Sequence, residues 1–270
     1  MLGLYGKKDI KVDQKYFGFS MEIDKIYNED CLVGMKAIPD KSIDAIICDL
    51  PYGTTACKWD VVIPFDRLWE QYERIIKDNG AIVLFGCEPF SSHLRLSNLG
   101  LYRYDIIWDK VNLYTGVFLA NKMPMKRHEN ISVFYKKQPT YNKQYRQGQA
   151  YKRKRKNAKG VGEYASSSYQ RIETVNDGNH NPCSILPIEG GNRSEKGFHP
   201  TQKPVELIRW LVRTYTNEGD LVLDNCMGSG TTAIACIKEK RHFIGYEITK
   251  EYFDIAQERI KQEQSKLTLF

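Results

Sequence analysis

Short apolar runs alternate with helical patterns along most of this chain, and no other feature constrains its fold as strongly. The runs of strand character are residues 42–50, 81–86, 104–108, 131–137, 220–225 and 242–247. The segments of helical pattern are residues 64–77, 89–99, a stretch that begins at Pro204, 231–238 and 250–262. Because crossover helices join parallel strands, this alternation predicts an α/β fold with a mostly parallel, doubly wound sheet.

Length and composition fit one main domain with a small appended lobe, since 270 residues can bury one sizeable core. No apolar run approaches the roughly 20 residues that span a bilayer. Charges at Lys7, Lys8 and Asp9 precede any apolar stretch of signal-peptide length. We therefore expect a cytoplasmic, intracellular protein with no membrane partner.

The cysteines and histidines give little support to a metal site. The seven cysteines are widely spaced and contain no CxxC pair, and no two histidines stand three or four residues apart. An odd number of cysteines, several of them inside apolar runs, fits a reducing compartment. No bound metal is expected.

Two glycines follow the strand 220–225 at the point where it turns into a helix. Gly228 and Gly230 would let the backbone approach a ligand, although such a turn can also serve a purely steric need. The next strand ends in Glu247, 23 residues after Asp224, a spacing that suits a carboxylate accepting from ribose hydroxyls. These features predict a nucleoside-cofactor crevice at the carboxyl edge of the sheet.

Two other nucleotide motifs fit this loop less well. Ala233 stands where a dinucleotide fingerprint has its third glycine, which disfavours NAD. No Gly-Lys-Ser/Thr follows the glycines, which excludes a P-loop.

The first core strand ends in a polar, rigid and aromatic cluster, Asp49-Leu50-Pro51-Tyr52. An exocyclic base amine is a poor nucleophile, and an acceptor pair such as the Asp49 carboxylate and the Leu50 carbonyl can hold its N–H bonds. Pro51 would fix the direction of that carbonyl, and Tyr52 offers a face on which an extruded base can stack. A simple turn that closes the strand would also use Asp and Pro, but it does not explain the aromatic residue.

Three motifs in this chain resemble those of one enzyme family. D-L-P-Y (49–52) is similar to the Asp/Asn/Ser-Pro-Pro-aromatic signature of amino-methyltransferases, and L-D-N-C-M-G-S-G-T-T (223–232) resembles their cofactor loop. H-P-T-Q-K-P (199–204) is similar to the element that precedes this loop in the β group of DNA amino-methyltransferases. The motif order is also that of the β group, and the resemblance covers roughly 22–137 and 198–262.

The resemblance implies a Rossmann-like, S-adenosylmethionine-dependent methyltransferase fold with circularly permuted motif order and an inserted target-recognition region. The organisation implied is an N-terminal extension (1–21), a catalytic half (22–137), the target-recognition insertion (138–197) and a cofactor-binding half (198–270). The insertion has no sustained hydrophobic period, which fits a separate lobe.

The resemblance also assigns residues to roles. The implied catalytic cluster is Asp49, Leu50, Pro51 and Tyr52. The implied S-adenosylmethionine-binding residues are Asp30, Cys31, Asp49, Thr201, Gln202, Lys203, Asp224, Asn225, Gly228, Ser229, Gly230, Thr231 and Glu247. Asp30 and Cys31 are expected near the cofactor adenine, and Thr201, Gln202 and Lys203 are expected to close the pocket from the other side.

This chain departs from the family pattern in two places. Leu50 replaces the more usual proline, and Asn225 with Cys226 replaces a usual Pro-Phe pair. Asp49 resembles adenine-specific members, whereas serine at this position is typical of cytosine-N4 enzymes. The sequence therefore predicts adenine N6 as the methylated atom, with cytosine N4 as the alternative.

A basic run within the insertion suggests how DNA is bound. The candidate DNA-binding residues are Lys143, Arg146, Lys152, Arg153, Lys154, Arg155 and Lys156. Tyrosines are interleaved with them, as suits phosphate neutralisation combined with base or sugar contact, although a solvated loop has the same composition. The net charge of +7 is compatible with a polyanionic partner.

The function predicted is site-specific methylation of double-stranded DNA by a bacterial or phage-encoded enzyme. A second copy of the chain and a cognate restriction endonuclease are candidate partners. Three alternatives stay open: cytosine-C5 methylation through Pro182-Cys183, an RNA or protein amino-methyltransferase, and an inactive DNA-binding protein. Intact Asp49 and Tyr52 argue against the last.

Overall fold

The chain forms two compact units, Met1–Asn142 with Ser184–Phe270, and Lys143–Cys183. The computed structural model describes residues 21–55, 57, 60–154, 173–190 and 202–267. Within these ranges no helix combines the length and the apolar character that crossing a membrane requires.

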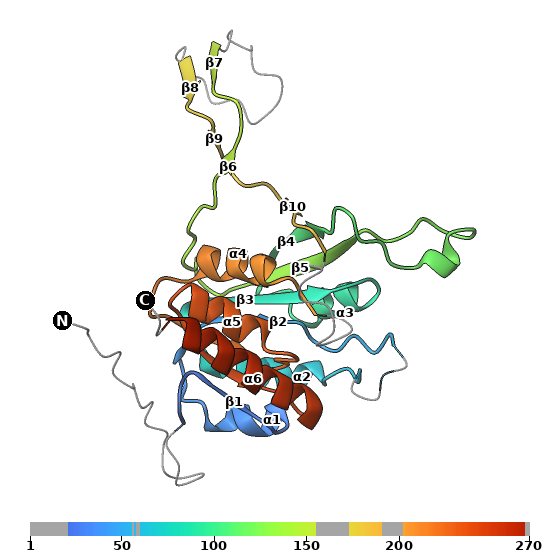
Figure 1. The fold of residues 1–270 in the computed structure, drawn as a ribbon, viewed down its shortest axis with the longest axis vertical. Helices are drawn as coiled ribbons and strands as arrows, with labels where there is room; N and C mark the ends of the chain where they lie inside the picture. The colour runs from blue at the N-terminus through green and yellow to red at the C-terminus, as the bar shows by residue number, and fades with distance from the viewer. Residues whose placement is uncertain (1–20, 56, 58–59, 155–172, 191–201, 268–270) are drawn as a thin grey trace, which may run out of the picture. The chain divides into compact units, whose positions relative to one another are not determined.

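The larger unit is built on an eight-stranded sheet in the order β1-β12-β11-β2-β3-β5-β4-β10 (Figure 1). Its strands are β1 (Lys25–Tyr27), β2 (Ile43–Cys48), β3 (Ile76–Gly86), β4 (Tyr102–Asp109), β5 (His128–Phe134), β10 (Ile185–Pro187), β11 (Leu221–Asp224) and β12 (His242–Tyr246). Among these strands, β5 runs antiparallel to both neighbours and the other pairs are parallel. The predicted mostly parallel sheet is confirmed.

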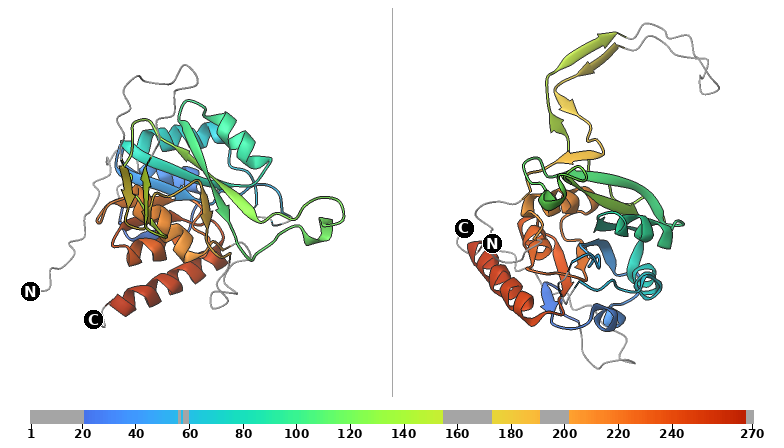
Figure 2. Two further views of the ribbon diagram at one scale, coloured as in Figure 1. Left: turned by 90° about the horizontal axis from the view of Figure 1, so that it is seen from above. Right: turned by 90° about the vertical axis from the view of Figure 1, so that its right-hand side faces the viewer.

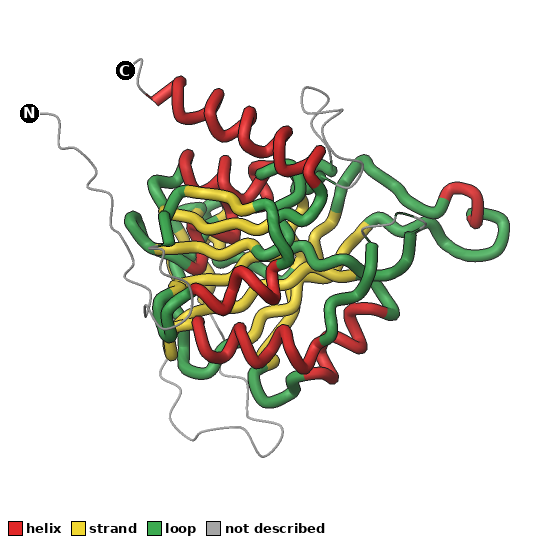
Figure 3. Tube along the Cα trace, turned by 90° about the horizontal axis from the view of Figure 1, so that it is seen from below, coloured by secondary structure: helices red, strands yellow, loops and turns green. Residues whose placement is uncertain are grey.

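Helices cover both faces of this sheet, so the sheet is doubly wound. The helical elements are α1 (Cys31–Gly34), η1 (Met35–Ala37), α2 (Phe65–Ile75), α3 (Phe90–Ser97), η2 (Val117–Leu119), α4 (Val205–Tyr215), α5 (Thr231–Lys238) and α6 (Lys250–Leu267). The last three of these, α4, α5 and α6, pack on one face, and α1, α2 and α3 pack on the other. Figures 2 and 3 show the sheet between these two helical layers.

Hydrophobic patterning explains why the predicted elements form. Residues 45–48 of β2, 81–86 of β3 and 221–223 of β11 are buried and form continuous apolar runs, as is typical of strands covered on both faces. On α6, within the helix predicted at 250–262, Ala256 and Ile260 are buried and Phe253 is partly buried against the core. The helix predicted at 64–77 ends earlier, because Ile76 already begins β3.

The smaller unit, Lys143–Cys183, contains two short antiparallel pairs. Strand β6 (Arg146–Gln147) pairs with β9 (Asn179–His180), and β7 (Tyr151–Lys154) pairs with β8 (Glu173–Asn176). The sequence showed no period for these strands. The predicted insertion, 138–197, is wider than this unit, since β10 belongs to the sheet of the larger one.

Gly230 allows α5 to start close to α6. Its φ of +84° is left-handed, and a Cβ there would lie 3.0 Å from the Cβ of Ala256. Gly219 has a similar φ of +81°, but a Cβ there would meet no atom within 4 Å. Alanine would therefore strain the backbone at both positions, but it would crowd a neighbouring helix only at Gly230.

We expect Gly230→Ala to destabilise the protein more than Gly219→Ala. The control should lose roughly 1–2 kcal/mol because alanine disfavours a left-handed backbone. Gly230→Ala should lose that amount and about 1–3 kcal/mol more, because the added methyl group overpacks against α6. Urea denaturation measures both, and equal losses would show that the α5–α6 contact does not need a glycine.

Candidate active site

A cavity of about 830 Å³ opens at the carboxyl edge of the sheet, and residues of the larger unit line it. Strands β1, β12, β11 and β2 are neighbours and run parallel, so the residues at their carboxyl ends meet there. Of the predicted site residues, those that line the cavity are Asp30, Cys31, Asp49, Leu50, Pro51, Tyr52, Gln202, Lys203, Asp224, Asn225, Gly228, Ser229, Thr231 and Glu247. The structure therefore brings both predicted halves of the site together.

Two side chains hold the carboxylate of Asp49. The hydroxyl of Tyr52 donates to Oδ1 at 2.6 Å, and Nζ of Lys203 donates to Oδ2 at 2.5 Å. The ring of Tyr52 packs against Phe90 with centroids 4.9 Å apart. Because each carboxylate oxygen has two lone pairs, Asp49 can still accept one further hydrogen bond at each oxygen.

Lys203 links Asp49 to a second acid–base pair. Its Nζ also lies 3.2 Å from Oε2 of Glu129, whose Oε1 is 2.6 Å from Nζ of Lys110. All of these groups except Asp49 have side-chain exposures of 10% or less. The four charges alternate in sign, so each buried charge has a partner of opposite sign.

This alternation sets the protonation of the site. Burial raises the pKa of Asp49, Lys203 lowers it and Glu129 raises it, with a net upward shift. Burial alone would raise the pKa of Glu129, but the two lysines outweigh it and the net shift is downward. Burial would lower the pKa of Lys203, but the two carboxylates raise it. Lys203 is therefore held as an ammonium ion, and its charge keeps the pKa of Asp49 from rising further.

Asp60 fixes the loop that follows the Asp49 cluster. Its carboxylate accepts from the backbone amides of Gly53, Thr54 and Thr55 at 2.8, 2.9 and 2.7 Å. Gly53 adopts a left-handed φ of +67°, and a Cβ there would lie 2.8 Å from Val62. The hydrogen bonds from Asp60 and the left-handed conformation of Gly53 together turn the backbone sharply after Tyr52, and the turn forms part of the cavity wall.

Asp224, at the end of β11, holds the loop that contains Gly228 and Gly230, which we call the glycine loop. Its carboxylate accepts from the hydroxyl of Thr232 at 2.6 Å and from the amide of Cys226 at 3.1 Å. Burial raises the pKa of Asp224 to about 6, although these hydrogen bonds oppose the shift. In this structure Asp224 acts on the loop itself, and the residue is buried.

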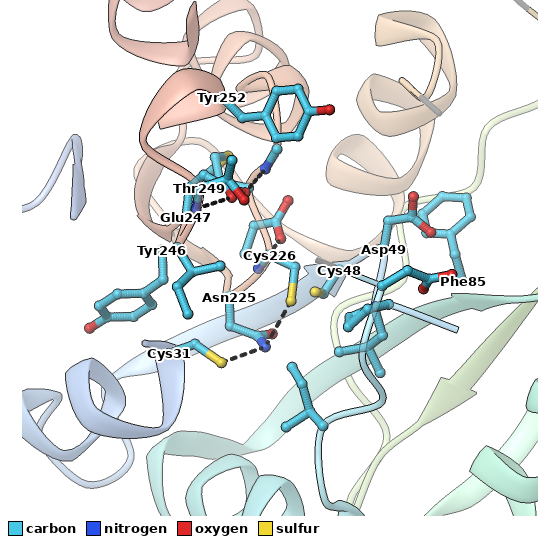
Figure 4. Close-up of a pocket in the computed structure, with 18 of the residues that line it drawn as sticks. Cys31, Cys48, Asp49, Phe85, Asn225, Cys226, Tyr246, Glu247, Thr249 and Tyr252 are labelled. Carbon is cyan, nitrogen blue, oxygen red and sulfur yellow. Dashed lines mark hydrogen bonds between the residues drawn. The ribbon is translucent and has the colours of Figure 1, made fainter. Parts of the chain in front are cut away.

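Glu247 lies at the opposite side of the cavity from Asp49 (Figure 4). Its carboxylate accepts from the amides of Gly228 at 2.8 Å and Thr249 at 2.7 Å, one at each oxygen. Burial raises the pKa of Glu247. A Cβ at Gly228 would meet no atom within 4 Å, so the space beside the loop is open. The Thr249 hydroxyl and the Ile248 amide also contribute hydrogen bonds to this carboxylate. Because the carboxylate lies beside open space, it can also accept from hydroxyl groups of a ligand.

Asn225 is turned into the protein. Its Oδ1 accepts from the hydroxyl of Tyr72 at 2.5 Å, and its Nδ2 lies 3.5 Å from the sulfurs of Cys31 and Cys226. Figure 4 shows the amide between these two thiols. The departure from the usual Pro-Phe pair therefore replaces an apolar loop segment with a hydrogen-bonded one.

Gly230 is not among the residues that line the cavity, and it packs against α6. Thr201 lies outside the described residues, so its predicted role stays a prediction. Cys183 is exposed, and it is not among the residues that line the cavity. This position does not favour the alternative of a Pro-Cys nucleophile.

The structure describes only some of the predicted DNA-binding residues. Lys143, Arg146, Lys152 and Arg153 are exposed residues of the smaller unit. Lys154 ends β7, and Arg155 and Lys156 lie outside the described residues. Their role stays a prediction.

Sequence reasoning missed Lys110, Glu129 and Asp60, and it expected Lys203 to close the cofactor pocket. Lys203 does line the cavity, and its ammonium also binds the Asp49 carboxylate. A usable signal existed for Glu129, because a glutamate two residues before the predicted strand 131–137 needs a partner when buried. In the described residues, no group of three or more His, Cys, Asp and Glu side chains could hold a metal ion.

Comparisons with known proteins agree with this geometry. A family model described as DNA methylase matches residues 43–258. The chain is 30% identical to type II methyltransferase M.HpaI of Haemophilus parainfluenzae, over 87% of this chain and 73% of the relative. It is 31% identical to type II methyltransferase M.BglII of Bacillus subtilis, over 89% of this chain and 70% of the relative.

The fold has solved counterparts as well. The crystal structure of the M1.HpyAVI–SAM complex matches with a TM-score of 0.59 and 25% identity, over 87% of this chain and 98% of that one. The predicted Rossmann-like methyltransferase fold and the family resemblance are confirmed.

We expect Lys203→Met to raise the pKa of Asp49, because the ammonium that favours the ionised carboxylate is lost while Glu129 remains. Lys110→Met is the matched control, since Lys110 contacts Glu129 and not Asp49; it should change the pKa of Asp49 less. Carbon-13 NMR titration of the labelled carboxyl groups measures both variants, after circular dichroism has shown that each is folded. An unchanged or lowered pKa of Asp49 in Lys203→Met would contradict the charge alternation.

Proposed function

Since the chain belongs to the N6/N4 DNA methylase family, we propose that this DNA methyltransferase transfers a methyl group from S-adenosylmethionine to the N6 amine of an adenine in double-stranded DNA. The observation that carries the proposal is the single cavity that joins Asp49 to the glycine loop and Glu247. The adenine target is supported by aspartate at position 49, where the family resemblance associates serine with cytosine-N4 enzymes.

The residues of the cavity fit the cofactor. A volume of about 830 Å³ accommodates a nucleoside-sized ligand together with a base. Glu247 presents a carboxylate to the ribose side, and the open space at Gly228 admits the methionine side. When bound, S-adenosylmethionine supplies an electrophilic methyl group on a sulfonium sulfur.

Asp49 acts on the amine of the base. Its carboxylate and the Leu50 carbonyl accept the two N–H bonds, which draws electron density onto nitrogen and directs its lone pair toward the cofactor side. Lys203 and Tyr52 hold the carboxylate in one orientation from two sides. Positive charge that develops on nitrogen lies next to the ionised carboxylate, which stabilises it. Activity must therefore fall as the pH falls through the raised pKa of Asp49.

The proposal extends to the partners. Exposed basic residues of the Lys143–Cys183 unit, with the exposed Tyr145 and Tyr151, suit a nucleic-acid backbone. A cognate restriction endonuclease is supported by the type II naming of both relatives. The proposal of a homodimer is supported by the family resemblance alone.

We expect Asp49→Ala to lower methyl transfer by at least 10²-fold, because general acid–base and acceptor groups contribute about that much. S-adenosylmethionine should still bind, since Glu247 and the glycine loop are untouched. Mass spectrometry of nucleosides from DNA modified in a methylation-free host measures the product, and calorimetry measures cofactor binding. Asp66→Ala, an exposed carboxylate of α2, is the control that should stay active.

Two results of that experiment would contradict the proposal. Full activity in Asp49→Ala would remove the carboxylate from the reaction. N4-methylcytosine as the product of the unsubstituted protein would replace adenine with cytosine while leaving the methyltransferase activity in place.

We expect replacement of the basic residues 152–156 by glutamine to weaken DNA binding and to flatten its salt dependence. Each lost phosphate contact should reduce the slope of log K against log salt by about 0.9. Fluorescence anisotropy over a salt series measures this, with Lys261→Gln on α6 as the control. An unchanged affinity and slope would show that the basic run does not contact DNA.

A further inference from the structure

The loop between β4 and β5, residues 110–127, carries an unusual set of exposed apolar side chains. The exposed large hydrophobic residues within it are Val111, Leu113, Tyr114, Val117, Phe118, Leu119, Met123 and Met125. Phe118 has a relative exposure of 103%, which means that its ring packs against nothing in the described part of the protein. Such a cluster on a protein surface marks a contact site.

The loop has a defined conformation. Thr115 and Lys126 form a two-way backbone bridge at 2.8 and 3.0 Å that closes its stem. Beyond the bridge, Gly116 adopts a left-handed φ of +81° and starts the short turn η2, Val117–Leu119, which places Phe118 at the tip. Figures 1 and 3 show η2 at the far end of this loop, away from the sheet. The exposed ring of Phe118 is therefore carried by a loop with defined backbone hydrogen bonds.

The loop leaves the sheet on the side of the active site. Strand β4 runs in the same direction as β2 and β3, so the loop follows its carboxyl end, the edge at which Asp49 lies. Lys110, the first residue of the loop, belongs to the charge alternation that reaches Asp49 through Glu129 and Lys203. The base of the loop and the catalytic carboxylate are therefore joined by direct contacts.

The charge of the loop selects its partner. Residues 110–127 contain no acidic residue, but Asp109 neutralises Arg127 through a 2.6 Å ion pair and Glu129 neutralises Lys110. Lys122 and Lys126 therefore give the loop its positive charge. Two such loops from two copies of the chain would repel each other, whereas a polyanion would be attracted. An apolar tip on a basic stem suits DNA, in which phosphates surround stacked apolar bases.

We propose that the β4–β5 loop is a DNA wedge, in which Phe118 enters the base stack at the position that the target base leaves. The inference rests on the proposed function, because methylation at Asp49 requires the base to leave the helix. Extraction of the base leaves a gap flanked by two base pairs. A ring inserted there restores part of the lost stacking and hinders the return of the base.

Methylation of two DNA duplexes by Phe118→Ala tests the wedge. One duplex has the target base paired, and the other has it opposite an abasic site, where less pairing must be broken. On the paired duplex the single-turnover rate of the variant should fall about tenfold or more, because no ring fills the gap that the extruded base leaves. On the abasic duplex the loss should shrink to about threefold or less, because the base leaves more easily there.

Two further variants sharpen the test. Phe118→Trp keeps a stacking ring and should retain activity on both duplexes. Leu99→Ala removes an equally apolar side chain, 62% exposed, from the turn before β4 at the opposite edge of the sheet, and it should behave as the parent protein. Cofactor affinity should be the same in all variants.

The outcomes separate the wedge from the proposed function. An active parent protein with an unaffected Phe118→Ala, or with equal losses on both duplexes, overturns the wedge alone. Conversion of a dimer into a monomer by Phe118→Ala in analytical ultracentrifugation, with equal losses on both duplexes, assigns the loop to a second copy of the chain instead. A parent protein that methylates neither duplex overturns the proposed function, and the wedge fails with it.

Discussion

The parallel pairing of β11 with β2 in the middle of the sheet is the constraint on which the site depends. Val222 pairs with Ala45 and Leu223 with Ile46, which joins segments near opposite ends of the chain. The carboxylate of Asp44 reinforces the junction by accepting from the amide of Leu221 at 3.0 Å. Because both strands end at the same edge, the glycine loop after β11 and the Asp49 cluster after β2 share one cavity. A permuted order of motifs along the chain is thereby compatible with one compact centre.

Electrostatics then fixes the catalytic side of that cavity. Lys203 lies between Asp49 and Glu129, and Glu129 is paired with Lys110. Buried ion pairs are not strongly stabilising by themselves, but removal of one partner leaves an uncompensated charge that costs about 3–5 kcal/mol. The arrangement therefore serves orientation and protonation of Asp49 more than stability. It also connects the active site to the base of the β4–β5 loop, where the proposed DNA wedge begins.

Periodicity predicted the α/β architecture because the central strands are buried on both faces and the helices on one. It missed β1 and the pairs β6–β9 and β7–β8, since two to four residues are too few to show a pattern. Motif spacing led to Asp49 and Glu247, whose positions follow from strand ends. It could not show that Lys203 reaches Asp49 or that Gly230 serves packing, because both depend on contacts between segments far apart in sequence.

The central claim is that one cavity aligns a base amine held by Asp49 with the methyl group of a cofactor held by the glycine loop and Glu247. A crystal structure of the protein with S-adenosylhomocysteine and a DNA duplex containing its target site tests it most directly. The account predicts an extruded adenine whose N6 donates to Asp49, with the cofactor sulfur in line so that a methyl carbon on it would lie roughly 3–3.5 Å from N6. A cofactor bound away from Gly228, or a base amine out of reach of Asp49, would contradict the account.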